Sequence, residues 1–176
     1  MEVYVDDMLV KSKEEEDNLE DLKETFNTLK QYSMKLNPLK CAFGVSSGKF
    51  LDFMVSQRGI EASPKKVRAI LEMSSPKTIK EVQSLMRRVA TLNKFVSKAT
   101  DKCLPFFKTL KQDFVKMDEC KVAFQELKRY LRNPPLLSPS KEGEDFFLYL
   151  AVSTTVVSAA LIREENKIQL SVYYIS

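Results

Sequence analysis

The sequence predicts an α+β protein in which short antiparallel β-hairpins flank a helical central region. β-Branched and aromatic residues gather in short runs near both ends of the chain, whereas apolar residues recur at spacings of three and four between residues 64 and 131. Short β-forming runs are typical of strands, and a period near 3.6 is typical of helices. With 44% hydrophobic and 30% charged residues, the 176-residue chain has a globular composition that suits one domain or two small ones.

The first elements are a hairpin and a helix. β-Formers flank Asp6 and Asp7 within residues 2–10, which predicts a tight hairpin with both acids at or beside its turn. Ser12 is the expected N-cap of the following helix, because acidic residues fill the next turn. The apolar stripe of that helix is Leu19, Leu22, Phe26 and Leu29, and Pro38 requires the helix to end before it.

A small sheet element and several helices follow. Residues 39–45 and 50–56 are expected strands, separated by a Ser-Ser-Gly turn. Pro64 suits the first position of a helix. Thr78 with Glu81 three residues later forms a capping-box pattern that opens a second helix. Further apolar periodicity predicts two more helices, over residues 101–110 and 118–131.

The C-terminal part of the chain is again rich in β-forming residues. Pro, Ser and Gly concentrate in residues 133–143, as expected of a linker. Three short β-forming runs follow, with a turn before the last, which predicts an antiparallel meander. The expected strands are 146–150, 156–162 and 168–174. The sequence therefore divides into four segments: 1–62, 63–133, the linker 134–144, and 145–176.

Composition excludes several classes of function. There is no histidine, which removes Ser-His and Cys-His nucleophile pairs and the commonest zinc sites. Three widely spaced cysteines without a CxxC pair do not form a disulfide framework. No apolar run approaches the roughly 20 residues that span a bilayer, and the N-terminus does not have the pattern of a signal peptide. We therefore expect an intracellular protein without a membrane partner.

Basic charge is concentrated in one region. Between Lys77 and Arg132, fourteen Lys or Arg residues face six Asp or Glu residues. Such a region suits the phosphate backbone of a nucleic acid. The alternative is a solvated, lysine-rich helix surface.

Tyr4-Val5-Asp6-Asp7 is the strongest local signal for chemistry. Two-metal phosphoryl transfer needs carboxylates that hold two Mg²⁺ ions about 4 Å apart. Adjacent acids on a tight turn supply part of that cluster, and a neighbouring strand must supply another carboxylate. The alternative is that Asp6 and Asp7 serve only the turn, because Asp favours such positions.

In its context this motif closely resembles the reverse transcriptases of gypsy-type long-terminal-repeat retrotransposons, particularly those of plants. The resemblance covers essentially the whole chain in order. Its segments are Tyr4-Val5-Asp6-Asp7, Leu36-Asn37-Pro38-Leu39-Lys40-Cys41-Ala42-Phe43, Phe50-Leu51-Asp52-Phe53, Gly59-Ile60-Glu61-Ala62, Lys80-Glu81-Val82-Gln83-Ser84-Leu85, Asp101-Lys102-Cys103-Leu104-Pro105, Leu148-Tyr149-Leu150-Ala151-Val152-Ser153 and Val172-Tyr173-Tyr174-Ile175-Ser176.

The resemblance implies roles for the first segment, which corresponds to the C-terminal half of the polymerase palm (1–62). Asp6 and Asp7 match the catalytic acids that bind Mg²⁺, with Asp6 the more direct ligand. Tyr4 and Val5 match residues beside the primer terminus. Lys40 falls near the incoming nucleotide, unless it is only a solvated loop lysine. The primer-grip hairpin of the family corresponds to Phe50, Leu51 and Phe53. Alternatively, these residues form only the core of the sheet.

Residues 63–133 correspond to a helical thumb or connection, and 145–176 to a truncated three-stranded RNase H-like domain. The thumb implies contacts with the sugar–phosphate backbone of an RNA/DNA template–primer duplex, here through Lys80, Arg87, Arg88, Lys94 and Lys98. In the RNase H-like strand Ala151 stands where an active enzyme has a metal-binding Asp, so no RNase H activity is expected. Asp52 and Arg87 replace glycines of the family, and a loss of stability is expected if those glycines allow close packing.

The implied activity is that of an RNA-directed DNA polymerase, a metal-dependent nucleotidyltransferase acting on a primer 3′-OH. The upstream palm Asp and the fingers of the family have no counterpart in this sequence. We therefore expect a retrotransposon polyprotein fragment that is inactive alone, with the rest of the polyprotein as a partner. The alternatives are a non-catalytic remnant that binds RNA/DNA duplex and a degenerate retroelement product.

Overall fold

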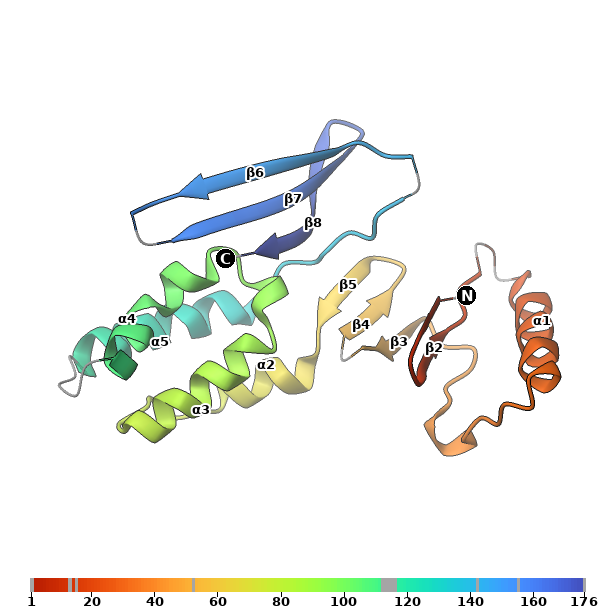
Figure 1. Cartoon of the computed structure of the whole chain (residues 1–176), viewed down its shortest axis with the longest axis horizontal. Coiled ribbons are helices and arrows are strands. Elements are labelled where there is room, and N and C mark those ends of the chain that lie inside the picture. Colours follow the sequence, from red (N-terminus) through yellow and green to blue (C-terminus); the bar gives the residue numbers. More distant parts are fainter. Residues whose placement is uncertain are drawn as a thin grey trace. The chain divides into compact units, whose positions relative to one another are not determined.

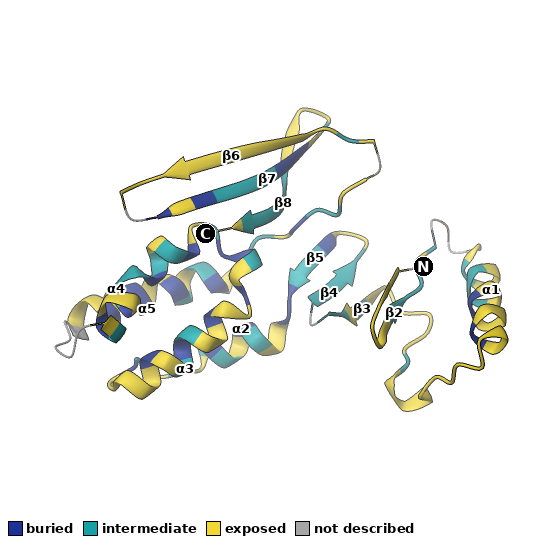
Figure 2. Cartoon of the chain, viewed as in Figure 1, coloured by how far each residue is buried: buried dark blue, intermediate teal, exposed yellow. Residues whose placement is uncertain are grey.

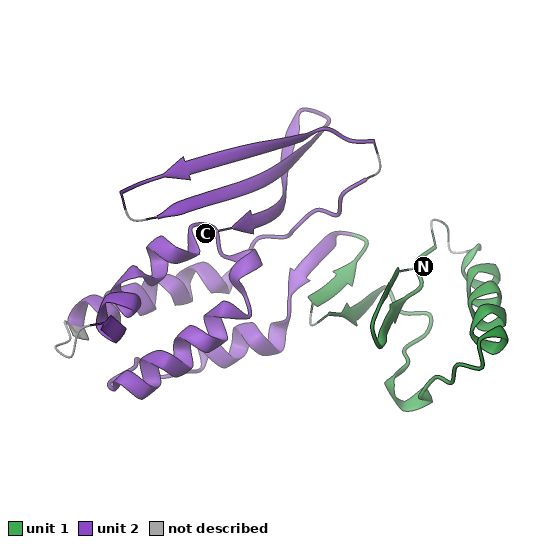
Figure 3. Ribbon diagram, in the orientation of Figure 1, with its two compact units in different colours: residues 1–57 green, residues 58–176 purple. Residues whose placement is uncertain are grey.

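The computed structural model describes residues 2–12, 14, 16–51, 53–111, 117–141, 143–154 and 156–175, without the side chain of Met117. The chain forms two compact units, Met1–Gln57 and Arg58–Ser176 (Figure 3). Antiparallel strands precede and follow a central run of helices, as expected (Figure 1), so the α+β class is confirmed. Within the described ranges, none of the helices combines the length and apolarity that a membrane crossing requires.

Unit 1 contains two β-hairpins and one long helix. Strand β1 (Glu2–Tyr4) pairs with β2 (Asp7–Leu9), and β3 (Ser47–Phe50) pairs with β4 (Phe53–Ser56). Helix α1 (Asn18–Gln31) and the 3₁₀ turn η1 (Pro38–Lys40) lie between the hairpins in sequence. Few side chains of this unit are buried (Figure 2).

The start of α1 differs from the prediction. Its N-cap is Asp17, whose side chain makes no capping hydrogen bond, and the expected N-cap Ser12 instead donates its hydroxyl to the Asp21 carboxylate. Thr25 and Leu29 are buried, whereas Leu19 of the expected apolar stripe is 79% exposed.

The expected strand over residues 39–45 is wrong. The chain forms η1 there and then continues without regular structure to Val45. The Asn37 side-chain oxygen accepts the Leu39 N–H at 3.1 Å. Such a local bond competes with a sheet ladder, and Pro38 fixes φ for the 3₁₀ turn while offering no N–H to a ladder.

Unit 2 begins with strand β5 and a group of helices. The elements are β5 (Gly59–Ala62), α2 (Pro64–Leu71), α3 (Ile79–Ala90), the 3₁₀ turn η2 (Asn93–Phe95), α4 (Ala99–Lys111) and α5 (Met117–Arg132). Pro64 opens α2, and Thr78 with Glu81 forms the predicted capping box of α3, with Thr78 Oγ1 accepting the Glu81 N–H at 3.2 Å. The buried core of this region is Ile70, Val82, Leu85, Val89, Leu92, Phe95, Val96, Phe106, Phe124, Leu127 and Leu131.

The linker is tied to β5 at a position that requires glycine. Ile60 and Leu137 exchange backbone hydrogen bonds of 2.8 and 3.0 Å. Gly59 has φ +139°, and a Cβ there would lie 2.4 Å from the Leu137 carbonyl oxygen. Any side chain at this position would therefore be strained and would push the linker away.

The C-terminal meander is confirmed. The sheet has the order β6 (Phe146–Val152), β7 (Val157–Glu165), β8 (Ile168–Ile175), with both pairs antiparallel. Asn166 and Lys167 both have positive φ at the β7–β8 turn, as a two-residue type I′ hairpin requires. Arg163 of β7 is buried and pairs with Glu144 at 3.1 Å and with Glu165, which joins the end of the linker to the sheet.

Candidate catalytic hairpin and cationic surface

The β1–β2 hairpin presents two adjacent carboxylates. Its register places Tyr4 opposite Asp7, so that Val5 and Asp6 form a two-residue turn. Val5 has φ +51°, a left-handed conformation that costs a β-branched residue on the order of 1–3 kcal/mol. Both acids are exposed, as are Tyr4 (60%) and Val5 (81%). The strained turn thus holds Asp6 and Asp7 at the exposed tip of the hairpin.

The chemistry of this pair suits a hard cation. Carboxylate oxygens are the ligands that Mg²⁺ prefers, usually with several waters retained. Over the residues that the structure describes, no group of three or more His, Cys, Asp or Glu side chains is placed to hold a metal ion. Asp6 and Asp7 could therefore share one ion, but a two-metal centre needs at least one further carboxylate from outside this set.

The second hairpin of unit 1 repeats the geometry of the first. Phe50 lies opposite Phe53, and Leu51 at the turn has φ +49°. All three side chains are half-buried. Asp52, which follows Leu51, lies outside the described residues. The expected primer-grip residues are therefore brought together at one end of a hairpin, a placement that both sequence interpretations allow.

Lys40 is the last residue of η1 and is exposed. Three residues later, the ring of Phe43 lies 6.1 Å from the ring of Phe26, a contact that holds this segment against α1. The structure therefore leaves Lys40 on the surface of unit 1, a placement that both sequence interpretations allow.

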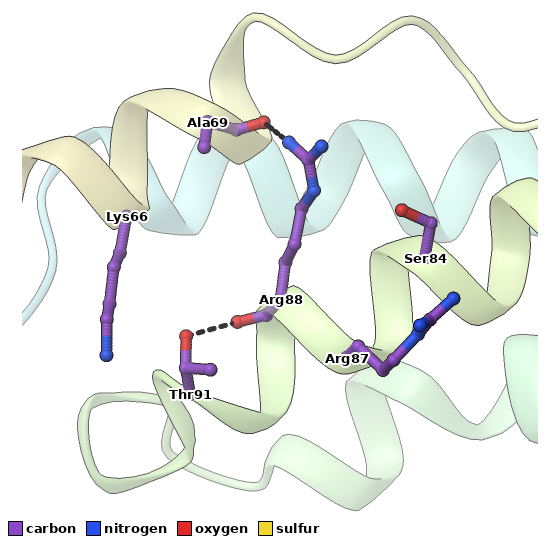
Figure 4. Close-up of a pocket in the computed structure, with 6 residues that line it drawn as sticks. All are labelled: Lys66, Ala69, Ser84, Arg87, Arg88 and Thr91. Atoms are coloured by element: carbon purple, nitrogen blue, oxygen red, sulfur yellow. Dashed lines mark hydrogen bonds between the residues drawn. The ribbon is translucent and has the colours of Figure 1, made fainter.

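Three cations line a shallow depression between α2 and α3 of unit 2 (Figure 4). Its volume is about 380 Å³, and the lining residues are Lys66, Ala69, Ser84, Arg87, Arg88 and Thr91. Arg88 crosses to α2 and donates from Nη1 to the Ala69 carbonyl at 2.5 Å. Arg87 is exposed and donates from Nε to the Gln83 carbonyl at 3.4 Å. The Arg87 side chain is therefore exposed and does not lie in the close helix contact on which the expected loss of stability depends.

The sequence reasoning had selected Arg87 and Arg88 but missed Lys66, Ser84 and Thr91. Ser84 and Thr91 stand three residues from Arg87 and Arg88 on the same helix face, so helical spacing was the available signal. Lys66 lies on another helix, and no local pattern connects it with α3.

The remaining cations of the predicted backbone interface are placed differently. Lys80 is exposed in the first turn of α3, and Lys98 is exposed just before α4 with φ +51°. Lys94 lies on η2, with its Nζ 5.4 Å from the centre of the Tyr173 ring. Lys94 thus faces β8 and is half-buried.

A tyrosine holds the segment between Lys94 and Lys98. Tyr130 of α5 donates from its hydroxyl to the Phe95 carbonyl at 2.8 Å, and the same oxygen accepts the Ser97 N–H at 3.1 Å. Lys102 stacks over the Tyr130 ring at 4.6 Å. Burial, followed by the nearby charge of Lys98, lowers the pKa of Lys102.

Ala151 lies on β6 opposite Ser158 of β7. It is exposed and offers no metal-binding group at this position of the strand. The prediction that an acid is replaced here is not tested by this geometry.

Comparisons with known proteins agree with the geometry. Residues 1–75 match the family described as reverse transcriptase (RNA-dependent DNA polymerase). The fold resembles that of the foamy viral protease–reverse transcriptase in complex with double-stranded DNA, with a TM-score of 0.77 and 18% identity over 94% of this chain and 35% of that one. The same viral protein in complex with an RNA/DNA hybrid gives a TM-score of 0.77 over 93% of this chain and 23% of that one. Residues 1–75 are thus similar in sequence to reverse transcriptases, and nearly the whole chain is similar in fold to the foamy viral protein.

Two curated relatives are similar to the chain over most of its length. The Tf2-3 and Tf2-7 transposon polyproteins of Schizosaccharomyces pombe are each 27% identical over 165 residues, which are 93% of this chain. The chain spans 12% of the length of these relatives.

Proposed function

We propose that the chain is the palm-to-RNase H junction of a gypsy-type reverse transcriptase. In this assignment residues 1–62 are the C-terminal half of the palm, 63–133 are the thumb or connection, and 145–176 are the first strands of an RNase H-like domain. Asp6 and Asp7 would hold Mg²⁺ for nucleotidyl transfer to a primer 3′-OH in the complete polyprotein. When bound, the ion would activate the attacking hydroxyl and stabilise the leaving pyrophosphate.

One observation carries this proposal. The Tyr4-Val5-Asp6-Asp7 motif lies within the matched residues 1–75 and folds as a tight hairpin with both acids at its tip. An ordinary turn does not need a valine at φ +51°, because glycine or asparagine would relieve the strain. Strain that persists beside paired carboxylates is typical of a functional site.

The 176-residue chain alone should not extend a primer. Two carboxylates leave the metal centre incomplete, so the second ion is not held. The test is a primer-extension assay with purified chain, Mg²⁺ and an RNA template annealed to a DNA primer. Template-dependent product that disappears in Asp6→Asn would overturn the prediction of inactivity. Isothermal titration with Mg²⁺ checks the site itself, since binding that is lost in Asp6→Asn supports the assigned ligand even without turnover.

A second function has support from the α2–α3 depression. The three cations Lys66, Arg87 and Arg88 that line it suit the phosphates of a nucleic-acid backbone. Together with Lys80 and Lys98, Arg87 and Arg88 form an exposed cationic surface on one unit. We infer that this surface binds RNA/DNA duplex without chemistry, through phosphate contacts that carry no sequence preference.

Salt dependence tests duplex binding. Each phosphate contact contributes a slope of about −0.9 to log K against log salt concentration. If the four exposed cations of this surface contact phosphates, the slope is roughly −3.6, which is about a 150-fold loss of affinity between 50 and 200 mM salt. Arg87→Ala should reduce the slope by about one, whereas Arg129→Ala, an exposed arginine on α5, is the matched control. A flat salt response, or equal effects of the two variants, would contradict this interface.

A further inference from the structure

One face of α1 covers a carboxylate at a place where an apolar side chain would be expected. Asp21, Thr25 and Leu29 stand four residues apart and therefore share one face of the helix. Thr25 and Leu29 are buried and Asp21 is half-buried, whereas Leu19 of the expected apolar stripe is 79% exposed (Figure 2). A helix that covers an acid and exposes a leucine breaks the usual pattern, and such departures are expected mainly at functional sites.

Ser12 pairs with this carboxylate. The Ser12 hydroxyl donates to Asp21 Oδ2 at 2.5 Å, within the range of a hydrogen bond to an ionised carboxylate. Asn18 Nδ2 in turn donates to Ser12 Oγ at 3.5 Å. All three side chains are half-buried. A covered carboxylate without a partner would destabilise the fold, and the Ser12 hydroxyl supplies that partner.

The same bond joins the exit of the candidate catalytic hairpin to α1. Strand β2 ends at Leu9, and Ser12 follows three residues later, well before Asp21 in the chain. Met8, Leu9 and Val10 are half-buried, and β2 contacts β3. The described packing of the hairpin therefore runs through β2 and the residues that follow it.

We propose that Ser12 and Asp21 are positioning residues for the pair Asp6 and Asp7. Their hydrogen bond holds the segment after β2 against α1, and β2 begins with Asp7. Metal ligands must be held within about 0.5 Å of their working positions, whereas a two-stranded hairpin is marginally stable by itself. The inference rests on the proposed metal-binding role of Asp6 and Asp7, and it adds the residues that restrain them.

The geometry favours this role for Asp21 over that of a third metal ligand. Within the described ranges, no group of three or more His, Cys, Asp or Glu side chains is placed to hold a metal ion. The Asp21 carboxylate is instead bonded to Ser12. Asp21→Asn separates the two roles, because the amide oxygen still accepts the Ser12 hydroxyl although the charge is removed.

Amide hydrogen exchange of the whole 176-residue chain, followed by NMR, tests the restraint without metal. In Ser12→Ala the amides of β1 and β2 should exchange about tenfold faster, because a hydrogen bond to a charged group is lost. The amides of α1 should keep their rates. Ser12→Thr retains the hydroxyl and Asp21→Asn retains the acceptor, so both should exchange slowly. Thr28→Ala removes an exposed hydroxyl from α1 and is the matched control.

Mn²⁺, a paramagnetic probe for Mg²⁺, tests the effect on the two acids. Broadening of the Asp6 and Asp7 resonances should need several-fold more Mn²⁺ in Ser12→Ala than in the wild-type chain or in Ser12→Thr, because apparent affinity falls with the fraction of chains in the competent state.

Unchanged hairpin exchange in Ser12→Ala overturns the positioning role. So does unchanged Mn²⁺ affinity, or exchange that quickens equally in α1, which would indicate a general loss of structure. A wild-type chain whose hairpin depends on Ser12 but whose acids are not broadened refutes the proposed metal site and not the restraint. Faster hairpin exchange and weaker Mn²⁺ binding, both reversed in Ser12→Thr, support the assignment.

Discussion

Replacing Tyr130 by phenylalanine should destabilise unit 2 by about 2 kcal/mol. The substitution removes one hydroxyl that satisfies two backbone groups, the Phe95 carbonyl at 2.8 Å and the Ser97 N–H at 3.1 Å. A hydrogen bond contributes roughly 0.5–1.5 kcal/mol net, so the loss of two such bonds costs about 2 kcal/mol. The ring remains, so packing is retained, and Lys102 keeps its aromatic surface 4.6 Å away.

Urea unfolding followed by circular dichroism measures this effect. With a slope of about 2 kcal/mol/M, the midpoint should fall by roughly 1 M. Tyr32→Phe is the matched control, because Tyr32 is 70% exposed and should change the free energy of unfolding by less than about 0.5 kcal/mol. Since Tyr130 holds the segment that carries Lys94 and Lys98, duplex affinity should fall as well. Equal midpoints for the two variants would refute the role of Tyr130 as a clamp.

Three further outcomes are expected. Thr78→Ala should lower the free energy of unfolding by about 1 kcal/mol in the same urea assay, because α3 loses its N-cap. Thiol labelling of the native chain at pH 8 should modify Cys41 and leave Cys103 unmodified until urea is added, since burial raises the pKa of the Cys103 thiol to about 11. Hydrogen bonds from Lys141 and then Arg163 lower the pKa of Glu165 in the folded chain. The ionised Glu165 therefore stabilises the fold above its unfolded pKa of about 4.3, and this stabilisation is lost as the pH falls through the lower folded pKa. Acid-unfolding curves should show a smaller loss of stability for Glu165→Gln.

The sequence predicted the elements whose signals are local. The capping box at Thr78 opens α3 because hydroxyl and carboxylate side chains satisfy the first backbone N–H groups regardless of the rest of the fold. Pro64 opens α2 for a similar reason, since its fixed φ suits the first turn and its missing N–H is not needed there. The three C-terminal strands were found because β-branched and aromatic runs alternate with turn residues.

Predictions failed where a single side chain decided between alternatives. β-Propensity favoured a strand over residues 39–45, but the Asn37 side chain bonds to the backbone two residues later and stabilises a 3₁₀ turn. Arg87 stands where the resembling family has a glycine, and its side chain is exposed on the surface of α3. The depression joins Lys66 of α2 with arginines of α3, a contact between helices that periodicity along one segment does not encode.

The proposed catalytic acids lie in unit 1 and the proposed cationic surface lies in unit 2, and the two units differ in how much of their chain is buried. In the described part of residues 1–57, only Thr25 and Leu29 are buried, whereas α2 to α5 share an apolar core. A two-stranded hairpin is marginally stable by itself, and metal ligands must be held within about 0.5 Å of their working positions. Asp6 and Asp7 therefore need more packing around unit 1 before they can act as a rigid metal site. Phosphate contacts tolerate looser geometry because charge attraction is not directional, and the cations of unit 2 already stand on packed helices. Duplex binding should consequently be retained under conditions in which catalysis by this chain is not supported.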